Sequence, residues 1–97
     1  MNNNFRSLLK NKTYLITGST GFLGNYLSTE LAKNESKLIL VDKDSKRLKN
    51  QKKKILQLTK HVKIYCCDFL DYKNRKIVFN NIRKENRKID CLLNNAS

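Results

Sequence analysis

Short apolar runs alternate along this chain with longer segments in which apolar residues recur at helical spacing. The run at residues 37–42 contains four consecutive apolar residues, which is typical of a strand buried on both faces. In the longer segments, apolar residues return every three or four positions, which predicts helices with one buried face. The predicted strands cover residues 13–17, 37–42, 62–68 and 89–93, and the predicted helices cover residues 22–34, 45–59 and 72–86.

The order of these elements, β-α-β-α-β-α-β, predicts fold class α/β. Strands that are each followed by a helix form a parallel sheet through right-handed crossovers. The expected strand order is 3-2-1-4, which places a switch point between the first and fourth strands. A complete dinucleotide-binding fold needs two such halves. We therefore interpret residues 1–97 as one partial domain, the N-terminal half of a doubly wound Rossmann sheet, truncated after the fourth strand.

The helical spacing also predicts which side chains face the sheet, and Phe5, Leu8 and Leu9 can form one helical turn beneath it. Asn34 is a plausible end for the first helix, and Asp44 or Ser45 can cap the second. The residues predicted to face the sheet are Leu23, Leu27 and Leu31 with Tyr26 beside them, then Leu48, Ile55 and Leu58, and finally Val78, Phe79 and Ile82.

A glycine-rich turn separates the first predicted strand from the first predicted helix. It holds three evenly spaced glycines, Gly18, Gly21 and Gly24. Gly18 permits the sharp turn off the strand, Gly21 leaves room for a pyrophosphate near the backbone, and Gly24 lets the helix pack closely on the sheet. The amides of the first helical turn then point at the phosphates, aided by the helix dipole. The turn therefore predicts a dinucleotide-binding loop.

The spacing of this loop resembles that of a known enzyme family. The segment TGSTGFLG at residues 17–24 is similar to the TGxxGxxG pattern of the extended, sugar-nucleotide-modifying branch of the short-chain dehydrogenase/reductases. The commoner short branch carries TGxxxGxG, and Phe22 stands where that branch has its middle glycine. The resemblance implies that Thr20, Phe22 and Leu23 join the three glycines in binding the cofactor.

An acidic residue ends the second predicted strand. Asp42 follows the last glycine at about the distance, roughly 20 residues, that the dinucleotide motif predicts. A carboxylate there accepts both hydroxyls of the adenosine ribose and repels a 2′-phosphate, which favours NAD over NADP. Lys43 is a cation beside the ribose that can tolerate a phosphate, so we count it with the cofactor-binding residues and do not exclude NADP.

Two later segments also resemble this family. Asp68 and Phe69 are similar to the acidic–apolar pair that holds the adenine ring through a side chain and a backbone amide. The tail NNAS at residues 94–97 resembles the NNAG segment of the short branch, with a serine in place of the glycine. This resemblance implies that Asn94 and Ala96 lie close to the nicotinamide ribose. The glycine loop thus favours the extended branch, whereas the tail favours the short branch.

The chain is strongly basic, with a formal charge of +13 and a pI of about 9.9. Its Lys and Arg residues are spread along the sequence among many Asn residues and no Pro, which indicates a compositional bias at solvated positions. The very basic helix at 45–59 keeps one apolar stripe, so its charges form a solvated outer face. We therefore expect no nucleic-acid partner.

The cysteine and histidine content indicates neither disulfides nor a metal. Cys66, Cys67 and Cys91 lie in apolar runs without CxxC spacing, and their odd number favours buried free thiols. The one histidine, His61, has no accompanying ligand spacing. No apolar run is long enough for a membrane span, and residues 1–12 lack the apolar core of a signal peptide. We expect a cytoplasmic protein with no membrane partner.

The resemblance implies an NAD(P)-dependent oxidoreductase that acts on a small-molecule alcohol or carbonyl and forms a homo-oligomer when complete. The family's catalytic Ser and Tyr-x-x-x-Lys lie beyond the NNAG segment, so we assign no catalytic residue here. Tyr72 and Lys76 have the Tyr-x-x-x-Lys spacing, but they open the wrong helix. Two alternatives are a nucleotide-sugar epimerase or dehydratase of the extended branch, with NAD bound as a redox relay, and a non-catalytic nucleotide-binding fragment.

Overall fold

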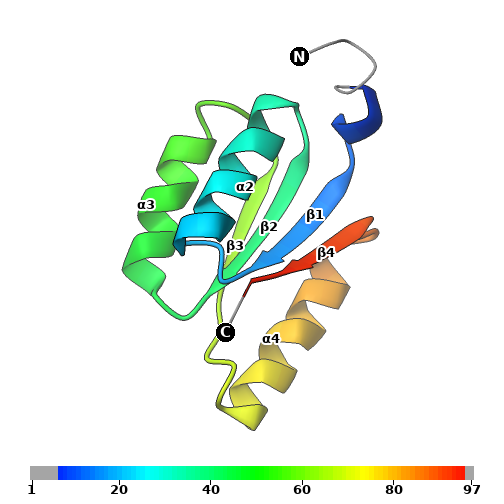
Figure 1. Ribbon diagram of the computed structural model, residues 1–97. Coiled ribbons are helices and arrows are strands. Elements are labelled where there is room, and N and C mark those ends of the chain that lie inside the picture. Colours follow the sequence, from blue (N-terminus) through cyan, green and yellow to red (C-terminus); the bar gives the residue numbers. More distant parts are fainter. Residues whose placement is uncertain (1–6, 96–97) are drawn as a thin grey trace.

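The computed structural model describes residues 7–95 and shows one parallel sheet flanked by helices (Figure 1). Its strand order is β3-β2-β1-β4, which confirms the predicted doubly wound order and its switch point. β1 lies inside the sheet and pairs in parallel with β2 and β4. The elements are β1 (Thr13–Thr17), α2 (Phe22–Lys33), β2 (Lys37–Asp42), α3 (Ser45–Ile55), β3 (Val62–Cys66), α4 (Tyr72–Glu85) and β4 (Cys91–Asn94).

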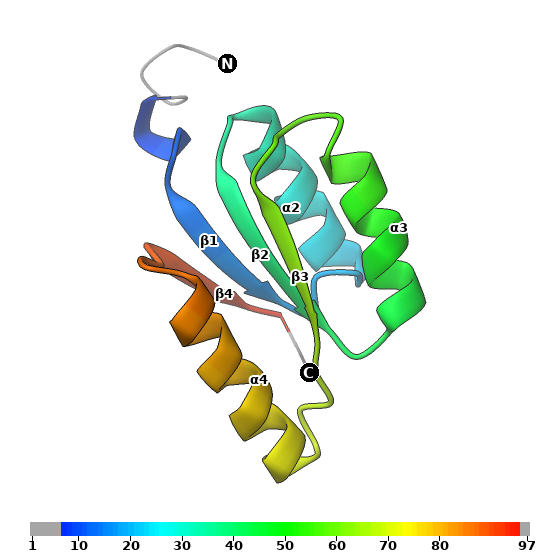
Figure 2. The same cartoon turned by 180° about the vertical axis from the view of Figure 1, so that it is seen from behind.

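Helices cover both faces of the sheet. α2 and α3 lie on one face and α4 lies on the other, as the two opposite views show (Figures 1 and 2). Alternate side chains of β2 therefore enter different cores. Leu38 and Leu40 pack in the cluster beneath α2 and α3, whereas Ile39 and Val41 pack in the cluster beneath α4. This arrangement confirms that β2 is buried on both faces, as its continuous apolar run predicts.

The buried face of α2 differs from the predicted one. Leu31 is buried as expected, but Leu23 and Tyr26 are 54% and 59% exposed, and Leu27 is only partly buried. The reason is the close approach of the helix to the end of β1, which brings its smallest residues against the sheet. The residues of α2 that are buried are Gly24, Ser28, Leu31 and Ala32.

The buried faces of the other two helices largely follow the prediction. Val78 and Ile82 of α4 are buried, and Phe79 packs partly buried against them. Leu48 and Ile55 of α3 are buried as well. Leu58 was expected to continue the α3 stripe, but it is exposed because the helix ends at Ile55. The amide of Leu58 donates to the carbonyl oxygen of Ile55 at 2.8 Å, within the turn that leads to β3.

Two predicted strand boundaries also shift. β3 ends at Cys66 rather than at residue 68, because Asp68 already takes part in a turn in which its side chain accepts the Leu70 amide at 3.0 Å. β4 begins at Cys91 rather than at residue 89. The amide of Thr13 donates to a side-chain oxygen of Asp90 at 2.8 Å instead of to a backbone carbonyl of the partner strand.

The predicted C-cap of α2 and N-cap of α3 are confirmed, whereas α3 ends at Ile55 rather than at residue 59. Asn34 is the C-cap of α2, and the Asp44 side chain caps α3 by accepting the Arg47 amide at 3.0 Å. A short helical turn also precedes β1, in which Leu9 packs against the core while Leu8 is exposed. The third residue of that predicted turn, Phe5, lies outside the described residues.

Candidate functional site

A pocket of about 330 Å³ lies where the carboxyl ends of the strands meet the glycine loop. The loop after β1, the ends of β2 and β3 and the tail after β4 all contribute to it, as expected for a ligand site at a switch point. We call it the switch-point pocket. It is lined by Gly18, Thr20, Gly21, Asp42, Lys43, Arg47, Asp68, Phe69, Leu70 and Asn95. Seven of the predicted cofactor-binding residues therefore line this one cavity: Gly18, Thr20, Gly21, Asp42, Lys43, Asp68 and Phe69.

The glycines that begin and end the loop have the predicted geometry. Gly18 has a φ of 63°, in the left-handed region that glycine adopts without strain, and it turns the chain off β1. At Gly24 a Cβ atom would collide with the carbonyl oxygen of Gly18 and lie 2.8 Å from the Cα of Ser19. Gly24 thus allows the close contact between α2 and the loop. Gly21 has more room, because its Cβ would meet only the Gly18 carbonyl oxygen, at 3.3 Å.

The amino end of α2 offers free donors to an anion. Gly21 is its N-cap, so no side chain caps the helix, and the first turn contains no acidic residue. Asn25 makes the first helical hydrogen bond, to the Gly21 carbonyl at 2.8 Å. The amides of Phe22, Leu23 and Gly24 have no acceptor among the described residues. Together with the helix dipole, these amides fit a phosphate or pyrophosphate.

The Asp42 carboxylate is tied to the glycine loop. Its Oδ2 accepts the Thr20 amide at 3.0 Å and the Thr20 hydroxyl at 2.7 Å, while its Oδ1 accepts the amides of Lys43 and Asp44. Partial burial acts to raise the pKa of Asp42, but the hydrogen bonds from Thr20, Lys43 and Asp44 outweigh it and hold the pKa below 3.8. Four donors use the lone pairs of both oxygens, so a ribose hydroxyl would have to compete with them.

Two residues of α3 reach the same loop, and neither was predicted from the sequence to belong to the site. Arg47 donates from Nη2 to the Thr20 carbonyl oxygen at 2.7 Å, and its side chain lines the switch-point pocket. Gln51 is buried and donates from Nε2 to the Ser19 carbonyl oxygen at 2.7 Å. The available signal was the polar residue Gln51 within the apolar stripe of Leu48 and Ile55. Arg47 could not be distinguished among the many cations of this helix.

Asp68 and Phe69 form the wall of the pocket that follows β3. The Asp68 amide donates to the Asn74 side chain at 2.8 Å, which fixes the turn before α4. Phe69 packs against Phe79 of α4, with ring centroids 6.0 Å apart, and its carbonyl oxygen accepts from Arg75 at 3.0 Å. Both predicted residues thus lie in the pocket on an anchored turn, and their contact with an adenine ring stays a prediction.

The tail after β4 is fastened to the end of β1. The Thr17 hydroxyl donates to the Asn94 side chain at 2.7 Å, and the Asn95 amide donates to the Thr17 carbonyl oxygen at 3.2 Å. Asn95 lines the pocket, and its buried side-chain Nδ2 has no hydrogen-bond partner among the described residues. The sequence pointed to this Asn pair but counted only Asn94 as cofactor-binding. Ala96, the other predicted residue, lies outside the described residues.

Tyr72 and Lys76 do not join this site. Both line a separate hollow on the outer side of α4. Tyr72 is exposed, and the guanidinium of Arg75 lies 5.5 Å from the centre of its ring. The two residues have the Tyr-x-x-x-Lys spacing, but they lie on the surface of α4 and do not line the switch-point pocket.

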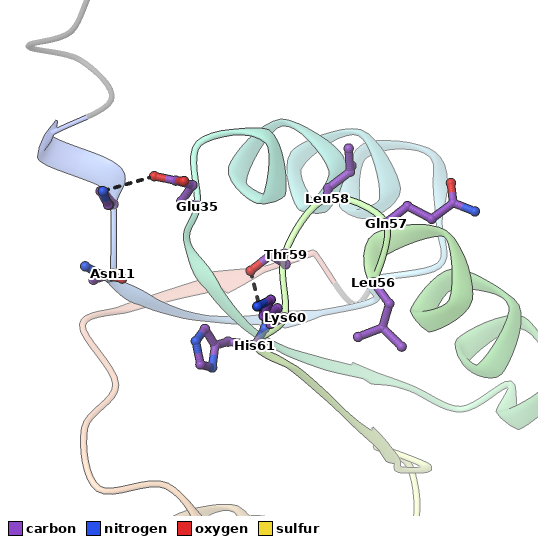
Figure 3. A pocket seen from close by; sticks show the side chains of 9 residues that line it. Asn11, Glu35, Leu56, Gln57, Leu58, Thr59, Lys60 and His61 are labelled. Carbon is purple, nitrogen blue, oxygen red and sulfur yellow. Dashed lines mark hydrogen bonds and ion pairs between the residues drawn. The ribbon is translucent and has the colours of Figure 1, made fainter.

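Another hollow, of about 380 Å³, lies at the opposite edge of the sheet, near the amino ends of β2 and β3 (Figure 3). Lys10 pairs there with Glu35 at 3.3 Å, and the His61 amide donates to the Thr59 hydroxyl at 3.3 Å. None of the predicted cofactor-binding residues lines this hollow. The ion pair and the hydrogen bond just named stabilise the turns around it.

The cysteines are free thiols, as the sequence indicates, but only Cys67 is fully buried, and burial raises its pKa. Cys66 was expected to be buried, yet it is exposed because β3 is an edge strand. Within residues 7–95, no group of three or more His, Cys, Asp or Glu side chains is placed to hold a metal ion. Over the same residues, no helix has the length and apolar character needed to cross a membrane.

Comparison with protein families gives a match over nearly the whole chain. Residues 12–97 match a family model described as short chain dehydrogenase. No protein with a curated description matches the sequence.

Solved structures match over the same region. An NAD+-bound xylitol dehydrogenase superposes with a TM-score of 0.83 at 23% identity, covering 92% of this chain and 34% of that one. An L-sorbose reductase from Gluconobacter frateurii, complexed with NADPH and L-sorbose, superposes with a TM-score of 0.81 at 24% identity. The match covers 91% of this chain and 34% of that one. A putative D-mannonate oxidoreductase from Haemophilus influenza with bound NAD superposes with a TM-score of 0.74 at 31% identity. The match covers 87% of this chain and 30% of that one. The chain spans about a third of the length of these structures.

Proposed function

The chain belongs to the short chain dehydrogenase family, and we propose that it forms the cofactor-binding part of an NAD(P)-dependent oxidoreductase that acts on an alcohol or a carbonyl. The observation that carries the proposal is the switch-point pocket, which brings the glycine loop together with the ends of β2 and β3. A nicotinamide cofactor supplies a hydride donor or acceptor when it is bound. The residues described here bind and orient it, and the proton-transfer group belongs to a further part of the fold.

The roles of the pocket residues follow from their chemistry. The free amides of Phe22, Leu23 and Gly24 would hold the pyrophosphate at the amino end of α2. Asp42 would face the adenosine ribose, and Asp68 with Phe69 would line the adenine subsite. The buried Nδ2 of Asn95, which has no hydrogen-bond partner within residues 7–95, supports a polar ligand near the switch point, where the nicotinamide ribose is expected.

Calorimetric titration of the purified protein with NAD+, NADP+ and adenosine tests the binding proposal. We expect both dinucleotides to bind and adenosine to bind much more weakly, because adenosine lacks the pyrophosphate that the helix amides would hold. Equal affinity for adenosine and the dinucleotides, or no dinucleotide binding at all, would contradict it. Turnover of polyols and ketoses by the full-length protein tests the reaction class.

The preference between the two cofactors is a finer proposal, and we infer NAD. Asp42 supports this choice, since a carboxylate at the ribose repels a 2′-phosphate. Lys43 and Arg47 line the same pocket and favour the phosphate, so the preference is expected to be small. The same titration measures it, and tighter binding of NADP+ would show that the two cations outweigh the carboxylate.

The glycine spacing favours a second candidate function, a nucleotide-sugar epimerase or dehydratase with bound NAD. Phe22 occupies the position at which short-branch enzymes have a glycine. The two candidates differ in their use of cofactor: an epimerase keeps NAD bound through each turnover, whereas an oxidoreductase releases the reduced or oxidised form. Net NADH production with a substrate supports the first function, and conversion of a sugar nucleotide without net NADH supports the second.

We further propose that the protein works in the cytoplasm as a homo-oligomer. The free thiols of Cys66, Cys67 and Cys91 support a reducing compartment. The outer edge of β4, which has no partner strand within residues 7–95, supports a larger assembly of strands or subunits around this sheet. Cell fractionation and light scattering of the full-length protein test the two statements.

A further inference from the structure

Gln51 is a buried polar residue in a helix face that is otherwise apolar. Its side chain is 5% exposed and lies between Leu48 and Ile55 on the inner side of α3. Both ends of its amide are hydrogen bonded. Nε2 donates to the Ser19 carbonyl oxygen at 2.7 Å and to the Asn25 side chain at 3.2 Å, and Oε1 accepts the Ser19 hydroxyl at 3.1 Å.

All of these partners belong to the glycine loop or to the first turn of α2. None of the hydrogen bonds of Gln51 goes to the sheet beneath it. An amide hydrogen bonded only within α3 would stabilise that helix alone. The amide of Gln51 is instead hydrogen bonded to Ser19, 32 positions away in the sequence. Its hydrogen bonds therefore restrain the loop.

The restrained atom determines where the next amide points. The Ser19 carbonyl and the Thr20 amide belong to one planar trans peptide unit, so they point in opposite directions. Gln51 holds the carbonyl on the α3 side, and the Thr20 amide points to Oδ2 of Asp42 at 3.0 Å. Arg47 holds the carbonyl of the following peptide unit, that of Thr20, at 2.7 Å.

We propose that Gln51 is a positioning residue that holds the glycine loop in its phosphate-binding conformation. The proposal rests on the proposed function, because it assigns Gln51 to the cofactor site of that enzyme. Ser19 and Asn25, the hydrogen-bond partners of Gln51, do not line the switch-point pocket, so the effect of Gln51 on a bound dinucleotide passes through the loop at Ser19 and Thr20. Substitutions of Gln51 should therefore weaken dinucleotide binding.

A pH-dependent rescue in Gln51→Glu tests this role. At neutral pH the glutamate is a pure acceptor and faces the Ser19 carbonyl without a proton to donate. Dinucleotide affinity should then fall about tenfold, the equivalent of one lost hydrogen bond. Burial raises the pKa of such a carboxyl, so it should protonate between about pH 7 and pH 5 and donate again to Ser19. We expect the affinity to recover toward that of the unmodified protein over this range.

Two variants serve as controls. Asn50→Asp introduces the same charge one residue away on an exposed position of α3, and it should change affinity little at either pH. Gln51→Met keeps the length and apolar packing of the side chain but has no donor, so its affinity should be reduced at every pH. Gln51→Met also tests the proposal if Gln51→Glu fails to fold.

Hydrogen exchange separates this proposal from the proposed function. The Thr20 amide of Gln51→Glu should exchange faster at neutral pH without any ligand, and return toward the unmodified rate at pH 5 after correction for intrinsic exchange. Unchanged exchange and unchanged dinucleotide affinity in Gln51→Glu and Gln51→Met would overturn the positioning role. If the unmodified protein binds no dinucleotide, the proposed function fails and the role in cofactor binding fails with it, whatever the exchange rates are.

Discussion

The three glycines of the loop after β1 meet different surroundings. Gly18 needs its positive φ, Gly24 lies against loop backbone, and Gly21 has only one close neighbour. Gly18 and Gly24 are therefore required by the fold itself. Gly21 is less confined than Gly24, because its Cβ would meet one backbone atom, the Gly18 carbonyl oxygen at 3.3 Å, and this is consistent with a role toward a ligand.

This difference predicts different effects for two alanine substitutions. Gly24→Ala should lower the free energy of unfolding by about 1–3 kcal/mol, because its Cβ would meet backbone atoms that cannot move aside. Gly21→Ala should cost less, about 1 kcal/mol, because its φ of −70° suits any residue but its Cβ would lie 3.3 Å from the Gly18 carbonyl oxygen and alanine is a poorer N-cap than glycine. Its dinucleotide affinity should nevertheless fall, because the methyl group intrudes on the pyrophosphate. Urea denaturation and calorimetric titration measure the two effects.

The opposite pattern would contradict the roles given to these glycines. A Gly24→Ala protein as stable as the unmodified one would mean that α2 can move away from the loop. Full dinucleotide affinity in Gly21→Ala would place the pyrophosphate elsewhere.

The hydrogen bonds of Asp42 predict how stability depends on pH. Because its folded pKa lies below 3.8, the ionised carboxylate stabilises the fold above that value, and this stability is lost as the pH falls through the folded pKa. Asp42→Asn should therefore cost about 1 kcal/mol at pH 7, a modest figure because solvent screens the partly buried carboxylate. The cost should shrink toward zero below pH 3.8. Urea unfolding across pH 3–7 measures it.

Thr20→Val gives a matched comparison for this effect. It removes the hydroxyl that donates to Asp42 at 2.7 Å and preserves the shape of the side chain. The pH dependence of stability should become weaker in this variant than in the unmodified protein. A cost of Asp42→Asn that stays constant from pH 7 to pH 3 would show that the carboxylate charge does not contribute.

Among the elements, β4 is an edge strand, like β3 on the other side of the sheet, and its outer edge has no partner strand in the described residues. Leu92 in β4 is 60% exposed and Ile89, just before the strand, is 37% exposed, so apolar side chains are exposed along this edge. Leu93, the next residue of β4, packs instead against the core beneath α2 and α3. Exposed apolar edges of this kind recruit other chains.

Residues 1–97 produced by themselves should therefore be marginally stable and associate in solution. Leu92→Lys should increase the monomer fraction, because an edge lysine opposes pairing with a second strand. Leu58→Lys places the same change on an exposed site at the opposite end of the sheet and should have little effect. Size-exclusion chromatography with light scattering measures both. A monomer with a cooperative unfolding transition before any substitution would contradict the prediction.

At the scale of the whole molecule, the switch-point pocket that we propose for the cofactor is lined by no tyrosine or histidine of the described residues. Hydride transfer to a carbonyl needs a proton donor with a pKa near the working pH. Tyr72 and Lys76 are separated from the switch-point pocket, since they line a hollow on the outer side of α4.

Residues 1–97 alone should therefore catalyse no hydride transfer. Purified 1–97 would be assayed for NADH formation or consumption against alcohols and ketones, beside a Tyr72→Phe control. No turnover is expected from either protein. Turnover that is lost in the control would show that Tyr72 is catalytic after all, and turnover that survives would show another acid or base in this chain.

The sequence alone determined the type and order of the elements. The short apolar runs and helical spacing predicted the strands and helices, and the capping role of Asp44 and the helix end at Asn34 were also readable. These features depend on residues close together in the chain. The glycine spacing and Asp42 likewise marked the site, because each lies at a fixed distance from a strand end.

Only the tertiary structure decided which helix faces are buried and what holds the loop. The spacing of leucines suggested that Leu23 faces the sheet, but the contact of Gly24 with the loop turns that residue toward solvent. Gln51 and Asp42 meet the loop across long stretches of sequence, so no local pattern shows that they share its hydrogen bonds. Helical periodicity defines a stripe of side chains, whereas the closest approach of two backbones determines which stripe is buried.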